Sequence, residues 1–300
     1  ERSITSSERA REVIFLLEPA GNDQADRLAS LLDQALQGSE LKLTRPAWNP
    51  TIDSPELEAS LAAWASDPPH AIVFSGVRHA LQRTIRDACG DRTIVIDVMC
   101  PLPEQTFMHC VSPDYRAVYR MAAEHLLSRG HRRIGIVTHR RNAPAGVAHD
   151  QIGRRFARNV KLQTFGQAVR AKRGRGGLTI HYQRAPGEPK VEAIVNWLAQ
   201  PDRPTAVYGS DHRVAQVIRA AERLGLRVPD ELEVLGEGNT MWAEEFEFPS
   251  IDLRLTQVID HVAAMLRREP SDYQHTRAEY LIQPRRIERA ATQTWEALTP

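Results

Sequence analysis

Two polar side chains in the first half of the chain follow apolar segments, as ligand-binding residues of α/β proteins do. Asn22 comes shortly after the apolar run 13–17, and Ser75 comes directly after the apolar run 71–74. If both runs are parallel strands, these residues lie at the carboxyl ends, where α/β folds bind small molecules. Turn formation is the other role that Asn and Ser have at such places. We therefore take Asn22 and Ser75 as candidate ligand-binding residues.

The residue patterns that carry catalysis or nucleotide binding are missing from the sequence. It contains no GxGxxG or GxxxxGK[ST] phosphate loop, no HExxH zinc motif and no GxSxG nucleophile turn. The cysteines Cys89, Cys100 and Cys110 are odd in number and lack the spacing of a zinc site, so we expect three reduced thiols. We expect no enzyme activity, no bound metal and no cofactor.

Charge and hydropathy restrict the partners. The formal net charge is +1, and a chain this close to neutral does not hold nucleic acid by bulk electrostatics alone. No apolar run approaches the ~18–20 residues that cross a membrane, and the first residues lack the apolar core of a secretion signal. We therefore expect a cytoplasmic protein. The basic clusters 139–141 and 172–175 fit a solvated surface, or else an anionic effector.

Short apolar runs alternate with segments of helical periodicity along the whole chain, which predicts parallel sheets covered by helices. The predicted strands are 13–17, 41–43, 71–74, 93–96, 134–137, 178–181, 206–208 and 232–235. The predicted helices are 23–36, 56–64, 80–88, 114–127, 153–171, 191–198 and 211–225. This order predicts two Rossmann-like lobes of similar size.

The last 50 residues are too few to form a third domain. They contain a predicted strand at 251–255, a helix at 258–266 and a strand at 280–282. We expect these elements to complete the two earlier sheets, so that several chain segments join the lobes in a hinged cleft. The predicted N-terminal lobe is 1–131 with 253–279. The predicted C-terminal lobe is 132–252 with 280–300.

Three stretches resemble the LacI-type family of bacterial transcriptional regulators, and they occur in the order of that family. The segment 125–135 reads HLLSRGHRRIG, and the family has a helix that ends in "HLL..GHRRIG". The segment 204–236 begins PTAVYGSD and ends GLRVPDELEVLG, similar to the family's "PTAV...D" and "GL.VP.D..V.G". The segment 284–289 resembles the closing "P.LV.R" strand. The spacing of the three covers nearly the whole chain.

The resemblance implies the type I periplasmic-binding-protein fold, a homodimer, and a small-molecule effector in the cleft between the lobes. A sugar or sugar derivative is the family's commonest effector. The resemblance also implies operator DNA as a partner, bound by an N-terminal helix-turn-helix domain of roughly 60 residues that precedes this chain. The polar residues before Val13 look like the end of the linker to that domain.

The resemblance further suggests effector-binding residues. Asp114 stands where the family often has an Asp that reaches the ligand, and helix N-capping is the alternative role. Ser210 and Asp211 stand where the family has an Asn or Asp pair, with capping again the alternative. A cation is implied in the helix after 139–151, where Arg154, Arg155 and Lys161 remain open candidates. At Lys161 an Arg of the family pattern would have become Lys, and an exposed basic helix face is the alternative.

The segment 236–240 reads GEGNT where the family has GFDD or GFGN. Asn239 fits the second form and is a candidate effector contact. Glu237 departs from the family because it replaces an aromatic residue. Trp242 is a candidate for an apolar wall of the pocket, and a packed core residue is the alternative.

Two other functions fit the predicted fold. An exported solute-binding protein for transport or chemotaxis has the same fold, but it requires a signal peptide and does not explain the motifs at 130–135 and 284–289. An enzyme on a doubly wound fold requires a catalytic constellation that we do not find. The leading hypothesis is the effector-controlled regulator.

Overall fold

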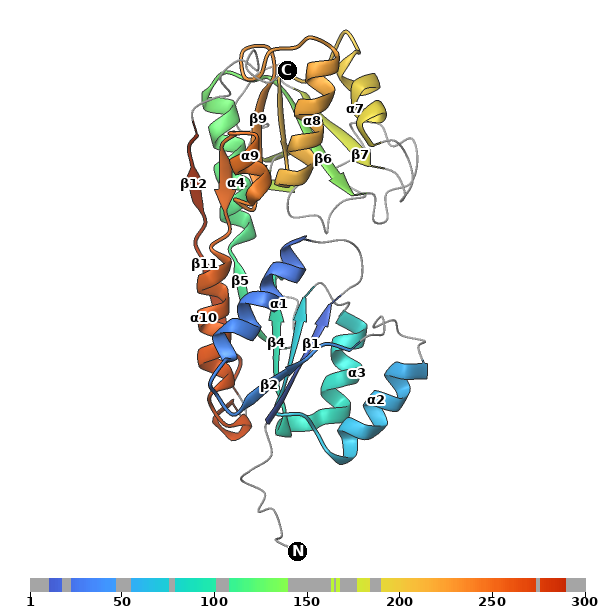
Figure 1. Cartoon of the computed structure of the whole chain (residues 1–300), viewed down its shortest axis with the longest axis vertical. Coiled ribbons are helices and arrows are strands. Elements are labelled where there is room, and N and C mark those ends of the chain that lie inside the picture. The colour runs from blue at the N-terminus through green and yellow to red at the C-terminus, as the bar shows by residue number, and fades with distance from the viewer. Residues whose placement is uncertain are drawn as a thin grey trace, which may run out of the picture. The chain divides into compact units, whose positions relative to one another are not determined.

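The computed structural model describes residues 11–17, 23–46, 55–75, 79–100, 108–139, 163–164, 166–167, 177–183, 190–273 and 276–289. The chain divides into two compact units. Unit 1 comprises residues 1–114 and 254–282, and unit 2 comprises residues 115–253 and 283–300. Each unit contains one six-stranded sheet (Figure 1). The predicted α/β fold with two lobes of parallel strands is confirmed.

Unit 1 contains a fully parallel sheet with strand order β11-β5-β4-β3-β1-β2. Its strands are β1 (Arg11–Leu17), β2 (Leu41–Thr44), β3 (Ala71–Ser75), β4 (Ile94–Val98), β5 (His109–Pro113) and β11 (Glu279–Ile282). Its helices are α1 (Asp23–Leu36), α2 (Pro55–Ser66), α3 (His79–Cys89) and α10 (Leu255–Leu266), with 3-10 turns at Gly90–Arg92 and Pro270–Tyr273. Helix α1 packs against α10, and α2 packs against α3 (Figure 1). Strands β3, β4 and β5 are buried at every position.

Unit 2 contains a sheet with strand order β12-β10-β9-β8-β6-β7, in which only β12 runs antiparallel to its neighbour. Its strands are β6 (Arg133–His139), β7 (Gly177–Gln183), β8 (Ala206–Gly209), β9 (Glu233–Glu237), β10 (Ser250–Asp252) and β12 (Arg285–Ile287). Its helices are α4 (Tyr115–Ser128), α7 (Lys190–Leu198), α8 (Asp211–Arg223) and α9 (Met241–Glu245). The predicted helix at 153–171 lies outside the described residues, except 163–164 and 166–167, which are helical.

The two sheets repeat one strand order. In unit 1 it runs β2-β1-β3-β4-β5, and in unit 2 it runs β7-β6-β8-β9-β10, each followed by one edge strand from the end of the chain. In both sheets the order reverses between the first strand (β1 or β6) and the third (β3 or β8). In open parallel sheets the carboxyl ends of the strands beside this reversal are where ligands bind. Among the described residues, the carboxyl ends of β3 and β8 lie beside this reversal, and β4 and β9 are their neighbours in the sheets.

The structure differs from the sequence prediction at β5 and at the unit boundaries. Strand β5 was not predicted, because HCVSP lacks both an apolar run and a clear alternation, yet it pairs with β4 and β11. Strand β11 falls in unit 1, although we expected residues 280–282 in the other lobe. Helix α4 falls in unit 2, although we expected 114–127 in the first lobe. A strand as short as β11 carries no sequence signal for its partner.

Candidate functional site

The carboxyl ends of β8 and β9 hold a buried carboxylate that accepts three hydrogen bonds. Asp211 is the first residue of α8 and is 1% exposed. Its Oδ2 accepts hydrogen bonds from the backbone N–H of Thr240 at 2.6 Å and from the Thr240 hydroxyl at 3.0 Å. Its Oδ1 accepts the hydroxyl hydrogen of Ser250 at 2.7 Å. The carboxylate therefore connects α8 to the segment after β9 and to β10.

The electrostatics of Asp211 follow from this position. Burial raises the pKa of Asp211 above its usual range, and the negative charge of Glu237 adds to the increase. The hydrogen bonds from Thr240 and Ser250 act in the opposite direction, because they stabilise the ionised form. The sequence predicts effector contact or helix capping for this residue. The structure gives its two oxygens internal partners.

A close approach at Gly236 explains one glycine of the LEVLG motif. A Cβ atom at this position would lie 2.1 Å from Asp211 Oδ1, 2.6 Å from Phe248 Cε2 and 3.1 Å from Ser250 Oγ. No side chain fits there, because the carboxylate of Asp211 crosses directly over the backbone of β9. The glycine and the aspartate are thus parts of one arrangement.

Two other candidate residues, Ser210 and Asn239, lie beside Asp211. Ser210 occupies the N-cap position of α8 without a capping side-chain hydrogen bond, and its Oγ lies 3.4 Å from His212 Nδ1. Asn239 has φ of 49°, its N–H donates to Ser250 Oγ at 3.0 Å, and its Oδ1 accepts from Arg289 at 2.6 Å. These two are half-buried and adjoin the Asp211 network.

Trp242 belongs to a packed cluster. Its ring lies 6.4 Å from that of Phe246, and the guanidinium of Arg219 lies 6.0 Å above it. It packs against the buried apolar residues of unit 2 while remaining partly exposed. This environment fits the core role that was the alternative for Trp242.

Two further ionisable side chains are buried at the same ends of β8 and β9, and sequence reasoning did not select them as site residues. Glu237, the last residue of β9, is 7% exposed and accepts a hydrogen bond from the hydroxyl of Tyr208. Arg213, in the first turn of α8, is 4% exposed. Burial lowers the pKa of Arg213 to about 10, and the charge of Glu237 opposes this decrease. Burial also raises the pKa of Tyr208 well above its usual range.

The equivalent edge of unit 1 carries a smaller polar group. Ser75 ends β3, is 7% exposed and stands beside Val98 of β4 in the register of the sheet. One residue earlier in β4, the buried carboxylate of Asp97 accepts a hydrogen bond from Gln82 Nε2 at 2.8 Å. Sequence patterns do not select Asp97 or Gln82, because both lie inside elements with otherwise ordinary patterns.

Asp114 lies between β5 and α4 and is half-buried; its N–H donates to Ile282 O at 2.8 Å. The remaining candidates, Asn22, Arg154, Arg155 and Lys161, lie outside the described residues. Their role in effector binding therefore stays a prediction.

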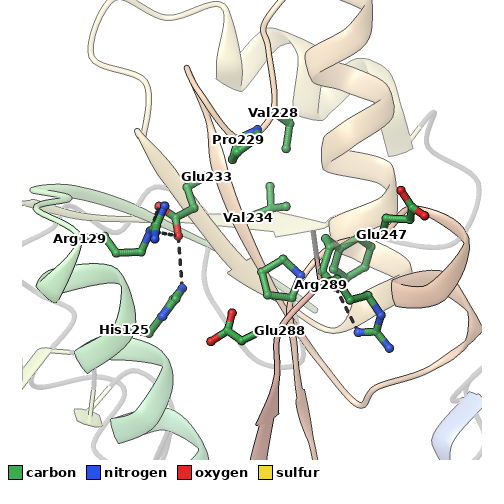
Figure 2. Close-up of a pocket in the computed structure, with 11 residues that line it drawn as sticks. His125, Arg129, Val228, Pro229, Glu233, Val234, Glu247, Glu288 and Arg289 are labelled. Atoms are coloured by element: carbon green, nitrogen blue, oxygen red, sulfur yellow. Dashed lines mark hydrogen bonds and ion pairs between the residues drawn. The ribbon is translucent and has the colours of Figure 1, made fainter. Parts of the chain in front are cut away.

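A separate pocket of about 120 Å³ lies in unit 2, near the start of β9 (Figure 2). Its apolar lining is Val228, Pro229, Val234, Phe248 and Pro249, and its charged lining is His125, Arg129, Glu233, Glu247, Glu288 and Arg289. It lies at the opposite end of β9 from Glu237, where parallel α/β sheets do not usually bind their ligands.

Glu233 is the centre of the polar contacts beside this pocket (Figure 2). Arg129 Nε lies 2.6 Å from Oε1, His131 Nε2 lies 2.6 Å from Oε2, and His125 Nε2 lies 3.2 Å from Oε1. Burial alone would raise the pKa of Glu233, but the contacts with His125, His131 and Arg129 outweigh it and hold the pKa far below its usual range. These contacts join the end of α4 to the start of β9. The GHRRIG and LEVLG motifs therefore meet in a structural cluster.

The described residues contain no group of three or more His, Cys, Asp or Glu side chains arranged to hold a metal ion. None of the helices in that part of the chain is both long enough and apolar enough to span a bilayer. The three cysteines are buried as free thiols.

Comparison with known proteins places the fold. A family model described as a periplasmic binding protein-like domain matches residues 123–292, more than half of the chain. A curated HTH-type transcriptional regulator of Streptomyces limosus is 30% identical over 190 residues, which cover 62% of this chain and 51% of the relative. The chain thus spans about half the length of that relative.

Solved structures at low identity share the fold. The lac repressor dimer bound to operator and the anti-inducer ONPF has a TM-score of 0.74 at 13% identity, with 96% of each chain covered. A LacI family regulator of Weissella paramesenteroides with bound glucose has a TM-score of 0.71 at 12% identity, covering 96% of this chain and 100% of that one. A periplasmic binding protein/LacI regulator of Alkaliphilus metalliredigens, complexed with D-xylulofuranose, has a TM-score of 0.66 at 17% identity, covering 95% and 100%.

These findings confirm the resemblance to LacI-type regulators that the motifs at 125–135, 204–236 and 284–289 indicated. The chain belongs to the family of periplasmic binding protein-like domains.

Proposed function

We propose that this chain is the effector-binding and dimerising core of a LacI-type transcriptional repressor. The observation that carries the proposal is the strand order shared by both units, 2-1-3-4-5 with an added edge strand, in a chain of the periplasmic binding protein-like family. The relative that is an HTH-type regulator supports a role in transcription rather than in transport.

The effector in this proposal is a sugar or sugar derivative, and the carboxyl-end edge of each sheet is a candidate site for it. Polar residues at those edges support this position, namely Ser75 in unit 1 and Ser210 and Asn239 in unit 2. The structures with glucose and D-xylulofuranose support a sugar, since both proteins share this fold. Operator DNA is bound by an N-terminal helix-turn-helix domain that precedes residue 1, and the regulator acts as a homodimer in the cytoplasm.

Effector control requires only a small coupling energy. A tenfold change of operator affinity corresponds to about 1.4 kcal/mol, which lies within the usual range of allosteric coupling. This coupling energy arises if the effector binds one arrangement of the dimer more tightly than the other.

Two measurements test the proposal. The first is a thermal-shift screen of this chain with sugars, sugar phosphates, nucleosides and organic acids. A true effector at 100 times its dissociation constant stabilises the folded state by about 2.7 kcal/mol. The second is a gel-shift titration of the full-length regulator on its own promoter DNA, with and without that effector. The proposal is contradicted if no helix-turn-helix segment is encoded upstream of residue 1. It is also contradicted if no stabilising ligand changes the affinity of the full-length regulator for DNA.

The same experiments distinguish the exported solute-binding protein. It would bind a ligand in the thermal-shift screen, sediment as a monomer and be encoded behind a signal peptide. A dimer by analytical ultracentrifugation at micromolar concentration supports the regulator.

A further inference from the structure

The guanidinium of Arg213 is buried without a complete set of partners. The side chain is 4% exposed, and in the described part of the structure its Nε has no hydrogen-bond partner. An unsatisfied charged donor away from water destabilises a fold, so folding alone gives no reason for an arginine here. A hydrogen-bond acceptor from a bound ligand would satisfy this donor.

The position of Arg213 places it at the edge where this fold binds ligands. It lies in the first turn of α8, and its backbone N–H donates to the carbonyl oxygen of the N-cap residue Ser210 at 2.9 Å. That turn follows β8 directly, beside the reversal of strand order in the sheet of unit 2. The helix N-terminus and the unsatisfied arginine are independent observations that indicate the same place.

Glu237 is the charge that balances Arg213. It is 7% exposed at the end of the neighbouring strand β9, and it is the only charged group that acts appreciably on Arg213 among the described residues. Its carboxylate accepts a hydrogen bond from Tyr208, and a carboxylate can accept several hydrogen bonds at once. The other nearby carboxylate, Asp211, accepts three hydrogen bonds at the start of α8, where the helix dipole also stabilises negative charge.

Glu237 is also where the sequence departs from the family it resembles, which has an aromatic residue there. The structure relates this departure to Arg213, because Glu237 is buried at the end of β9 and Arg213 is buried at the start of α8. Together they carry no net charge. They offer a hydrogen-bond donor and an acceptor in place of an apolar ring face.

On the basis of the proposed function, we infer that Arg213 and Glu237 form a recognition pair for an uncharged, hydroxylated effector. A ligand oxygen accepts a hydrogen bond from the Arg213 guanidinium, and a ligand hydroxyl donates to the Glu237 carboxylate. A ligand carboxylate or phosphate would add negative charge beside the buried carboxylates of Glu237 and Asp211, and Arg213 is the buried arginine of the described residues at this edge. An ammonium group would compete with Arg213 for Glu237.

A matched ligand panel tests the charge preference. Calorimetric titration of the 300-residue chain would compare D-glucose, D-xylulose and cellobiose with glucuronate, glucose 6-phosphate and glucosamine. We expect a neutral sugar to bind at least about tenfold more tightly than its charged analogues, the loss expected for one charged hydrogen bond. A charged analogue that binds as tightly or more tightly overturns this inference but leaves the proposed sugar effector intact. Failure of all six to bind overturns both.

A double variant separates recognition from folding. Arg213→Met with Glu237→Gln keeps an unbranched side chain in place of the aliphatic part of the arginine and keeps the acceptor for Tyr208, and it removes both buried charges. We expect an unchanged or higher melting temperature, because the unsatisfied guanidinium is gone, and sugar binding weaker by about tenfold or more. Arg223→Met, on the exposed end of α8, is the matched control and should leave the sugar affinity unchanged. Unchanged affinity in the double variant overturns the inference.

A single variant gives a second readout that does not depend on stability. Glu237→Gln leaves Arg213 as an unbalanced positive charge. We therefore expect the ratio of glucuronate affinity to glucose affinity to rise at least about tenfold relative to the parent chain. An unchanged ratio means that Glu237 does not face the effector, and it overturns the recognition pair.

Discussion

Replacement of Glu233 by Gln should destabilise unit 2 through the cluster at the start of β9 (Figure 2). The carboxylate takes contacts from Arg129, His131 and His125, at 2.6, 2.6 and 3.2 Å. A glutamine keeps one acceptor oxygen but presents an amide to the other donor groups. At least one of the three nitrogens then loses its partner.

The size of the effect depends on how deeply each contact is buried. The Arg129 side chain is 55% exposed, so water replaces its partner at little cost. The side chains of His131, His125 and Glu233 are 17%, 8% and 8% exposed, so their contacts dominate. A hydrogen bond to a charged group contributes about 1.5–3 kcal/mol. We expect Glu233→Gln to lower the free energy of unfolding by about 2 kcal/mol.

Urea denaturation of the 300-residue chain measures this change, and hydrogen exchange locates it. The amides of β9 and of the last turn of α4 should lose protection in Glu233→Gln. Glu222→Gln, an exposed glutamate near the end of α8, is the control and should change stability by less than about 0.5 kcal/mol. Equal stability of the two variants, or unchanged protection at the end of α4, would show that the cluster does not join these elements.

The pH dependence gives an independent check. The pKa of Glu233 is held below its ordinary value of 4.5 in the folded chain, so the unfolded chain binds the proton first as pH falls. The stabilisation is therefore complete above pH 4.5 and decreases below it. The stability difference between the parent chain and Glu233→Gln should become smaller as pH falls below 4.5. A difference that grows in that range would refute the assignment.

Further predictions concern three buried positions. Gly236→Ala should destabilise unit 2 by about 3 kcal/mol or more, because the new Cβ would lie 2.1 Å from Asp211 Oδ1; urea denaturation checks it. Asp211→Asn should lower the free energy of unfolding by about 2 kcal/mol in the same assay, because it loses hydrogen bonds to a charged carboxylate. The control Asp202→Asn, at an exposed position, should leave the free energy of unfolding unchanged. Burial, followed by the charges of two arginines, lowers the pKa of His109 to about 4 from 6.5. The unfolded chain thus binds the proton first, and unit 1 should lose about 3 kcal/mol between pH 7 and pH 4, a loss that His109→Gln abolishes in pH-dependent melting.

Much of the fold follows from local sequence patterns. The runs at 71–74 and 93–96 became strands β3 and β4, and the segment 23–36 became helix α1 with the predicted ends. Patterns of this kind show which face of a strand or helix is apolar, and that is a local property of the sequence. Strand β5 has no such pattern, because its mixed residues are buried only through their neighbours β4 and β11.

The sequence by itself determined most of the element types and the family. Only the tertiary structure decided the partners of the polar side chains. Asp211 was expected at an effector or a helix cap, and it lies among Thr240, Ser250 and the backbone of β9. Arg213 had no motif, yet its Nε is one of the buried side-chain atoms of the described residues that lack a hydrogen-bond partner. The reason is physical: charge pairing and solvation depend on atoms brought together from distant segments, and the spacing of residues along a chain does not record that proximity.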